Sequence, residues 1–321
     1  LSLLGNGLAE INKISPRTAR RLADAVETIR LAELINRADL VHVGKALSEI
    51  ARVSSAKARA GLKAADRKVL ARKVSTAPLK TLTKALNELN GIDRHLTREL
   101  YLTLDEATLV AALDMAAMEA FGRAVRELHA IDPEKTAHVL GCVSLQKTAS
   151  RLQSVSLLQI SHTLAELNQA DTNLARMLYH AIPSELLANK LTDEHFDFQQ
   201  LWSLTCNLNK VNGSDRRTSN LLRKAGIDFL VRRIHAERFE GIAAGLYDIF
   251  KCDADLGRDI LSRLDVRFLE AKAKLEQFEK ICQGINRLAA IDRPKAVELV
   301  KRFNPAWLAE RCAALPADRL G

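Results

Sequence analysis

Aspartate recurs along this chain at nearly even intervals, and a row of carboxylates is a possible site for a divalent cation. Taking Asp93 as the anchor, the row reads Ser15, Ser54, Asp93, Asp132, Asp171, Asp215, Asp253 and Asp292, with spacings of 39, 39, 39, 39, 44, 38 and 39 residues. Serine cannot replace a carboxylate in such a site, whereas both Ser and Asp accept hydrogen bonds from the free amides of a new helix. We therefore interpret the eight anchors as helix N-caps.

The other reactive side chains form no catalytic or metal-binding pattern. The eight histidines share no position relative to the anchors, and His138 with Cys142 lacks further ligands nearby. C-x-x-C, H-E-x-x-H, G-x-x-x-x-G-K-[ST] and G-x-S-x-G motifs do not occur. We predict a protein that is not an enzyme, with no catalytic residue, cofactor, metal or small-molecule substrate.

The cysteines bear on cellular location. All five are far apart among apolar neighbours, which is typical of buried, reduced thiols in a cytoplasmic protein: Cys142, Cys206, Cys252, Cys282 and Cys312. The sequence has neither a signal-peptide pattern nor the roughly 20 apolar residues that span a bilayer. We expect an intracellular, monomeric segment of a longer protein without membrane contact, and delivery into another cell remains open.

Asparagines recur six and three residues before the anchors, in what we call the asparagine row. Asparagine donates and accepts hydrogen bonds at once, so such a row can hold the backbone of an extended peptide. Asparagine is also common near helix C-termini, which is the competing interpretation. The predicted peptide-binding residues are Asn87, Asn90, Asn168, Asn209 and Asn212.

Charge is concentrated at the start of the chain. The net charge is +9, and residues 1–80 hold 16 Lys or Arg against 7 Asp or Glu, so this segment carries the whole excess. Its densest part is a basic patch, which is either a solvated helical face or a contact surface for an acidic protein, a nucleic acid or a membrane. The basic patch comprises Lys57, Arg59, Lys63, Arg67 and Lys68.

An arginine column stands five residues past the anchors. Such a column is able either to follow a phosphate backbone or to pair with acidic residues of the next unit. Ala137, Asn220 and Val297 interrupt it, and aromatic residues that would stack on bases make up only 4% of the chain. Nucleic-acid binding is therefore the alternative function. The column comprises Arg20, Arg59, Arg98, Arg176 and Arg258.

The elements that position these residues follow from apolar columns 14, 11, 7 and 4 residues before each anchor. Their steps of three, four and three describe one stripe of a helix, here called helix A. Each anchor then begins a second helix, B, whose fifth residue is always small, and this predicts close packing there. The segments IPSELLANKL, LDVRFLEAKA and FNPAWLAERC indicate a short third helix, C.

These patterns predict an all-α fold, an α-solenoid of eight units at about 1–39, 40–78, 79–117, 118–156, 157–200, 201–238, 239–277 and 278–316. A 39-residue unit of three helices resembles the armadillo and HEAT class of helical repeats. The resemblance implies a single superhelical domain over 1–321 that serves as a binding scaffold. We predict that it binds a protein or an extended peptide.

One longer interval interrupts the period. Five extra residues near 191–202 bring together Phe196, Phe198 and Trp202. This insertion is either a binding loop or an adjustment of helix packing.

Overall fold

The chain folds into α-helices alone wherever its structure is described. A computed structural model describes residues 1–193, 198–212 and 216–313, and within these ranges it contains 24 α-helices and no strand. The predicted all-α fold class is confirmed. The helices follow one another in the order long, short, short, and we call these sets A, B and C.

The bounds of the helices are as follows. Set A comprises α1 (Ser2–Ile14), α4 (Leu40–Val53), α7 (Leu79–Asn90), α10 (Met118–His129), α13 (Leu157–Ala170), α16 (Phe198–Asn212), α19 (Phe239–Cys252) and α22 (Phe278–Ile291). Set B comprises α2 (Pro16–Ala25), α5 (Ser55–Ala64), α8 (Arg94–Leu102), α11 (Pro133–Cys142), α14 (Thr172–Ala181), α17 (Arg217–Ala225), α20 (Ala254–Arg263) and α23 (Arg293–Arg302). Set C comprises α3 (Thr28–Arg37), α6 (Arg67–Thr76), α9 (Glu106–Met115), α12 (Leu145–Ser154), α15 (Ser184–Asp193), α18 (Ile227–Ile234), α21 (Val266–Ala273) and α24 (Pro305–Ala313).

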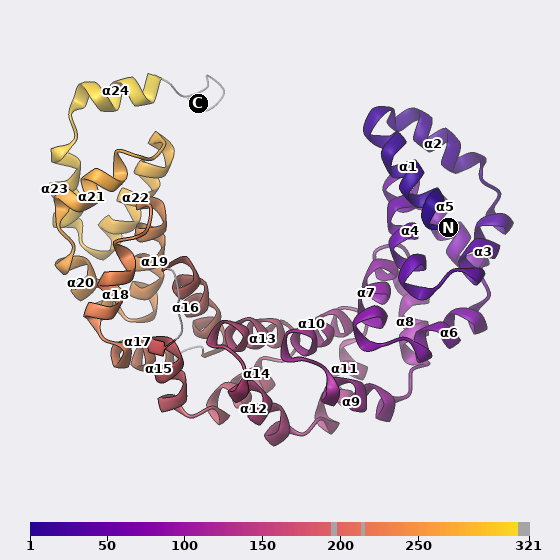
Figure 1. Cartoon of the computed structure of the whole chain (residues 1–321). Helices are drawn as coiled ribbons and strands as arrows, with labels where there is room; N and C mark the ends of the chain where they lie inside the picture. Colours follow the sequence, from indigo (N-terminus) through magenta and orange to yellow (C-terminus); the bar gives the residue numbers. More distant parts are fainter. Residues whose placement is uncertain (194–197, 213–215, 314–321) are drawn as a thin grey trace. The chain divides into compact units, whose positions relative to one another are not determined.

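These helices fall into two compact units. Unit 1 holds residues 1–151 and 166–175, and unit 2 holds residues 152–165 and 176–321. In unit 1, set A helices pack on one another in chain order, α1 on α4 and α4 on α7, and they line one side of the unit while α3 and α6 lie on the other (Figure 1). In unit 2, α16 packs on α19 and α19 on α22.

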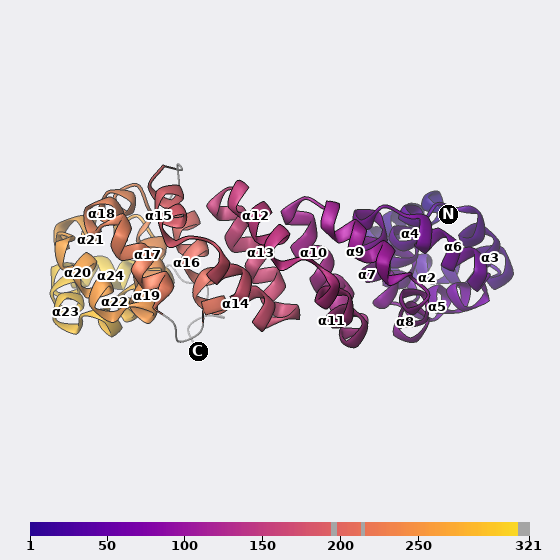
Figure 2. The same cartoon turned by 90° about the horizontal axis from the view of Figure 1, so that it is seen from below.

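Sets B and C are coupled in the same way within each unit. Set C helices pack on the set B helix that follows them, as α3 does on α5, α6 on α8, α18 on α20 and α21 on α23. In Figure 2, α18 and α21 lie above α20 and α23 in unit 2. The division of the whole chain into eight units of one domain stays a prediction.

The apolar columns of the sequence form the core. In set A, the columns 11, 7 and 4 residues before the anchors are buried from α4 to α19, including Val43, Leu47 and Ile50 of α4 and Ile242, Leu246 and Ile249 of α19. The small residue of each set B helix is buried in all eight helices. At Gly257, an added Cβ would lie 2.7 Å from Cα of Phe250, so α19 and α20 touch through their backbones. The predicted close packing is confirmed.

Small residues also bring successive set A helices together. A Cβ added to Gly5 of α1 would lie 2.9 Å from the carbonyl oxygen of Ala46 in α4, and one added to Gly44 of α4 would lie 3.0 Å from Cα of Ala85 in α7. Real Cβ atoms essentially never approach a backbone as closely as at Gly5 and rarely as closely as at Gly44, so the absence of a side chain at both positions suits this helix separation. Gly5 and Gly44 thus allow neighbouring set A helices in unit 1 to lie close together.

The predicted helix caps are present at six anchors. The side-chain oxygens of Ser15, Asp93, Asp132, Asp171, Asp253 and Asp292 accept hydrogen bonds from the backbone amide three residues later. Ser54 departs from the prediction, because its hydroxyl donates to Asp24 Oδ1 at 3.0 Å instead of capping α5. Asp215 lies outside the described residues.

Candidate functional site

The basic patch lies on α5 and α6 in unit 1, and three of its five side chains contact the next helix of set A or B. Arg59 Nε donates to the carbonyl oxygen of Ile92 at 3.1 Å, Lys63 Nζ lies 3.7 Å from Asp93 Oδ2, and Arg67 pairs with Glu99 at 3.0 Å. Lys57 and Lys68 form no side-chain hydrogen bond or ion pair with the described residues. The structure thus gives this patch a partly structural role that the sequence analysis did not assign.

A hollow opens where the basic patch meets the end of α7. It has a volume of about 390 Å³ and is lined by Arg59, Lys63, Asn90, Asp93 and Arg94, among others. The structure therefore brings two residues of the basic patch together with one residue of the asparagine row. Three cations and one carboxylate give this hollow an excess of positive charge.

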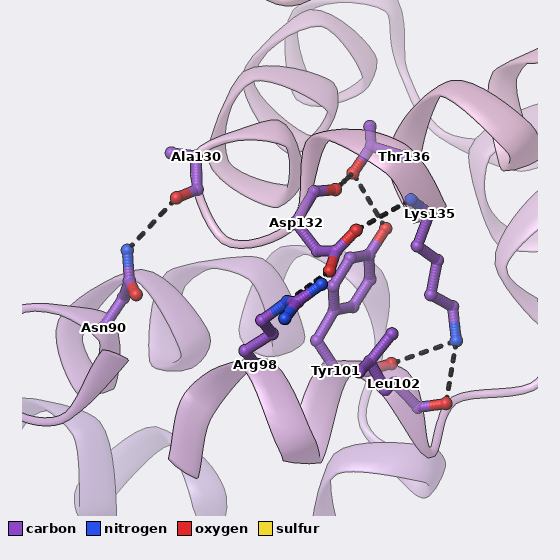
Figure 3. A network of polar contacts seen from close by, with 8 residues as sticks. All are labelled: Asn90, Arg98, Tyr101, Leu102, Ala130, Asp132, Lys135 and Thr136. Carbon is purple, nitrogen blue, oxygen red and sulfur yellow. Dashed lines mark hydrogen bonds and ion pairs between the residues drawn. The ribbon is translucent and has the colours of Figure 1, made fainter. Parts of the chain in front are cut away.

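The arginine column contributes to contacts between helices of set B and the next anchors. Arg98 Nε donates to Asp132 Oδ2 at 2.6 Å, and Figure 3 shows its guanidinium directed at that carboxylate. Arg258, in contrast, pairs within its own helix with Asp255 at 3.4 Å. Pairing with the neighbouring anchor, one of the two alternatives for this column, is confirmed at Arg98.

Asp132 sits at the centre of the polar network in Figure 3. Asp132 is 2% exposed, and its carboxylate accepts one hydrogen bond from the backbone amide of Lys135, at 2.8 Å, and another from Arg98 Nε. The pKa of Asp132 is lowered, first by the hydrogen bond from the Lys135 amide, and this outweighs the effect of burial. The hydroxyls of Tyr101 and Thr136 lie 3.0 Å apart in the same network, and burial raises the pKa of Tyr101 to about 12.

Lys135 binds the end of the preceding set B helix. Its ammonium donates to the carbonyl oxygens of Tyr101 and Leu102 at 3.1 Å and of Leu104 at 2.5 Å. Burial lowers its pKa. The last carbonyls of a helix have no partner within the helix, so a buried cation that reaches those of Tyr101 and Leu102, and that of Leu104 just past α8, adds a hydrogen bond to each.

The same arrangement recurs elsewhere in both units. Lys295 donates to the carbonyl oxygens of Leu261 and Ser262, and Lys73 donates to those of Ile35, Asn36 and Ala38. Arg151 and Arg217 reach the carbonyl oxygens of Ala116 and Ile182. Several cations that the sequence analysis counted only as charge therefore serve as caps for helix C-termini.

The asparagine row is only partly free to contact a partner. Asn87 is exposed on α7, whereas Asn90 Nδ2 lies 3.5 Å from the carbonyl oxygen of Ala130 at the end of α10 (Figure 3). Asn168, also in unit 1, is half-buried, and its Oδ1 has no hydrogen-bond donor. Asn209 is half-buried in unit 2, and the side chain of Asn212 lies outside the described residues.

A row of glutamates escaped the sequence analysis although the same anchors reveal it. Five residues before the first five anchors, every residue is Glu: Glu10, Glu49, Glu88, Glu127 and Glu166, all within unit 1. This glutamate row follows α1, α4, α7 and α10 and ends on residue 166 of α13. Asn87 and Glu88 are adjacent on α7, so the asparagine and glutamate rows run side by side there.

One member of the glutamate row, Glu88, lies where its charge is disfavoured. Burial raises the pKa of Glu88, and the carboxylates of Glu127 and Glu49 raise it further against the opposing effect of Lys84 and Lys45. Glu127 is 9% exposed, and its Oε2 accepts no hydrogen bond within the described residues. Partly buried carboxylates that repel one another oppose folding, and such groups are enriched where a protein binds something else.

Cysteine exposure departs from the prediction. All five thiols are free, but Cys142 and Cys282 are exposed, and Cys206, Cys252 and Cys312 are half-buried. The prediction of buried cysteines is therefore wrong, because an apolar neighbour in sequence points to a different face of the helix from the cysteine itself. Burial raises the pKa of both Cys206 and Cys252 to about 11. The cytoplasmic location stays a prediction.

Within the described ranges, no three His, Cys, Asp or Glu side chains gather in a group able to hold a metal ion. No helix in the described part of the chain is long and apolar enough to span a bilayer.

The insertion near 191–202 is only partly described. Trp202 is half-buried in α16, and its indole Nε1 donates to Asp248 Oδ2 of α19. This contact supports the packing interpretation at Trp202. Phe196 and the side chain of Phe198 lie outside the described residues.

Comparison with known proteins adds no family. No protein-family model matches the sequence, and none of the curated proteins is significantly similar to it.

Proposed function

We propose that the chain is a non-catalytic α-solenoid of eight repeats. It binds an extended segment of a partner protein along the face of its set A helices that carries Asn87. The observation that carries this proposal is the glutamate row of unit 1, which an exposed asparagine, Asn87, adjoins on α7. Carboxylates repeated from helix to helix, together with the amides of α7 and α13, suit the regularly spaced N–H and C=O groups of an extended backbone.

The contacts within each unit support the solenoid part of the proposal. The set A helices α1, α4, α7 and α10 pack in chain order, and set C helices such as α3, α6, α18 and α21 pack on the following set B helix. Repeat arrays are held together by such contacts between neighbours, because one repeat cannot bury its own apolar face.

The chemistry of the set A face supports a protein partner. Asn87 is exposed, and Glu88 next to it is half-buried with a pKa that is raised first by burial and further by Glu127 and Glu49. Backbone N–H groups of a bound segment would supply the donor that Glu127 Oε2 lacks within the described residues. Contacts made to a partner's backbone tolerate many side-chain sequences, as a scaffold requires.

The experiment uses a library of random 12-residue peptides displayed on phage, selected against the chain and then measured by fluorescence polarisation. We expect Asn87→Ala, Asn168→Ala and Asn209→Ala to weaken a selected peptide about tenfold in combination, at unchanged helix content. Asn189→Ala is the matched control, since Asn189 is an exposed asparagine of a set C helix. Equal binding by the triple variant and the control would reject this face.

A second function, nucleic-acid binding, is favoured by one observation. Beyond the basic patch, exposed cations of α2, α6 and α8 form no side-chain hydrogen bond or ion pair with the described residues, and these are Arg17, Arg20, Arg21, Arg72 and Arg94. A surface of unpaired cations attracts phosphates in a strongly salt-dependent way. We expect the combined substitutions Lys63→Glu, Arg67→Glu and Lys68→Glu to abolish such binding. If the unaltered chain binds neither DNA nor RNA at low salt, this function is excluded.

A further inference from the structure

Unit 2 contains a hollow that neither the peptide nor the nucleic-acid proposal uses. It has a volume of about 650 Å³ and lies between α17 and the joint of α14 with α15. Arg217, Arg223 and Lys224 of α17 line it, and Glu185 is its one carboxylate. The formal charge of these four side chains is +2.

The volume and walls of this hollow suit a small organic ligand. Small-molecule sites measure about 300 to 1,000 Å³ and combine apolar walls with a few directed polar groups. Leu187 and Leu221, which are 0% and 4% exposed, form the apolar floor of this hollow, and Ser184 and Asn220 supply neutral polar groups. The hollow beside α7 is smaller, at about 390 Å³.

Two of the cations are held in place by contacts behind them. Arg223 donates through Nε and Nη2 to the two carboxylate oxygens of Asp253, at 2.6 and 2.7 Å. The Arg217 guanidinium lies over the Tyr179 ring, with its central carbon 4.8 Å from the ring centre, and donates to the carbonyl oxygen of Ile182. Both side chains are thus oriented before any ligand arrives, which reduces the entropy lost on binding.

The third cation is paired with a group that a ligand can displace. Lys224 Nζ lies 2.8 Å from Glu185 Oε1, and the Glu185 side chain is 76% exposed. The pKa of Glu185 is lowered, first by its hydrogen bond from Lys224. An exposed ion pair contributes little stability, so an oxyanion of higher charge is able to take the place of the carboxylate beside Lys224.

We infer that this hollow binds a phosphate monoester of a small organic molecule. Lys224 and the guanidinium groups of Arg217 and Arg223 would face the phosphate, and the organic part would lie over the apolar floor of the hollow. A phosphate monoester carries close to two negative charges at neutral pH and three acceptor oxygens, which suit a hollow lined by three cations, of which Arg223 is already paired with Asp253.

The test measures binding to the full chain by isothermal titration calorimetry at constant ionic strength. The probes are adenosine monophosphate, O-phospho-L-serine, inorganic phosphate and, as the uncharged control, adenosine. We expect saturable binding of adenosine monophosphate, weaker binding of inorganic phosphate and none of adenosine. Equal affinities for inorganic phosphate and adenosine monophosphate would overturn the role of the apolar walls. Tighter binding of O-phospho-L-serine than of adenosine monophosphate would assign the phosphate to a modified partner side chain, and no binding by any probe would overturn the site.

Two substitutions with opposite expected signs make the test specific. Glu185→Gln removes the competing carboxylate and should tighten adenosine monophosphate about fivefold, whereas Lys224→Gln should weaken it by a similar factor. Lys274→Gln is the matched control, because Lys274 is also 46% exposed and paired with a glutamate, Glu270, but does not line the hollow. The inference fails if Glu185→Gln weakens binding, or if Lys224→Gln behaves like Lys274→Gln.

Discussion

Arg98 Nε donates to Asp132 Oδ2 at 2.6 Å, so an arginine of α8 holds the residue that caps α11. The carboxylate thus serves two helices at once, since one oxygen caps α11 and the other binds α8. The Asp132 side chain therefore both caps the start of α11 and links α11 to α8.

Replacing Asp132 should destabilise unit 1. Asp132→Ala removes the cap and leaves Arg98 without its acceptor, and we expect the free energy of unfolding to fall by about 2 kcal/mol, measured by urea denaturation. Because the pKa of Asp132 is lowered, its contribution should be complete above its ordinary value of 3.8 and decline as the pH falls below it. Arg98→Met, which leaves the cap intact, should cost less, and an equal loss would contradict the dual role.

Lys135 should be intolerant of an uncharged replacement. Lys135→Met leaves the carbonyl groups of Leu102 and Leu104 without the Lys135 donor, whereas that of Tyr101 keeps the Leu104 amide, and we expect a loss of about 2 kcal/mol in the free energy of unfolding. Lys147→Met is the control, because Lys147 is 53% exposed and binds only Asp114. Thermal unfolding that is the same for both variants would show that the carbonyl contacts contribute nothing.

Removing the charge of Glu88 from the glutamate row should make unit 1 more stable. Glu88→Gln should raise the melting temperature at pH 7, since the raised pKa means that the folded state disfavours the carboxylate. The native state binds more protons than the unfolded state just above the ordinary value of 4.5, so wild-type stability should increase as the pH falls through that window.

The variant should lose this pH response, which differential scanning calorimetry between pH 7 and 4.5 would record. Glu10→Gln is the control at the exposed end of the row, where the side chain is 70% exposed and pairs with Lys13. A melting temperature lowered by Glu88→Gln would show that the attraction of Lys84 and Lys45 dominates.

The five thiols should separate by their rates of alkylation. Cys142 and Cys282 are exposed and should react first with a maleimide at pH 7.5, whereas Cys206 and Cys252, with pKa values near 11, should react at least tenfold more slowly. Mass spectrometry of peptides after timed labelling measures this order. Rapid labelling of Cys206 would mean that α16 opens readily from α19.

Features in which one side chain has one dominant role were predictable from the sequence. The apolar stripe of Val43, Leu47 and Ile50 and the cap at Asp93 follow from local periodicity and capping chemistry, and both are confirmed. Roles that depend on a partner about 30 to 40 residues away were not predictable. Nothing around Ser54 signals that its hydroxyl binds Asp24, and nothing around Lys135 signals that it reaches Leu104.

The glutamate row was not predicted from the sequence, for a different reason. Its spacing was available from the same anchors, but glutamate is common on exposed helix faces, and its burial became evident only from the packing of α7 against α4. The asparagine row shows the reverse case. Asn87 and Asn90 were predicted together, yet the structure exposes the first and places the second beside the carbonyl oxygen of Ala130.

The contacts that join neighbouring helices also bear on how such a gene can grow. Arg59 to Ile92, Arg98 to Asp132 and Lys295 to Leu261 each span 33 or 34 residues, slightly less than one sequence period. An in-frame duplication of one period would carry both a donor and an acceptor, each in register with the adjoining copy. Chain length in this protein can thus change by whole periods without a compensating substitution at the junction.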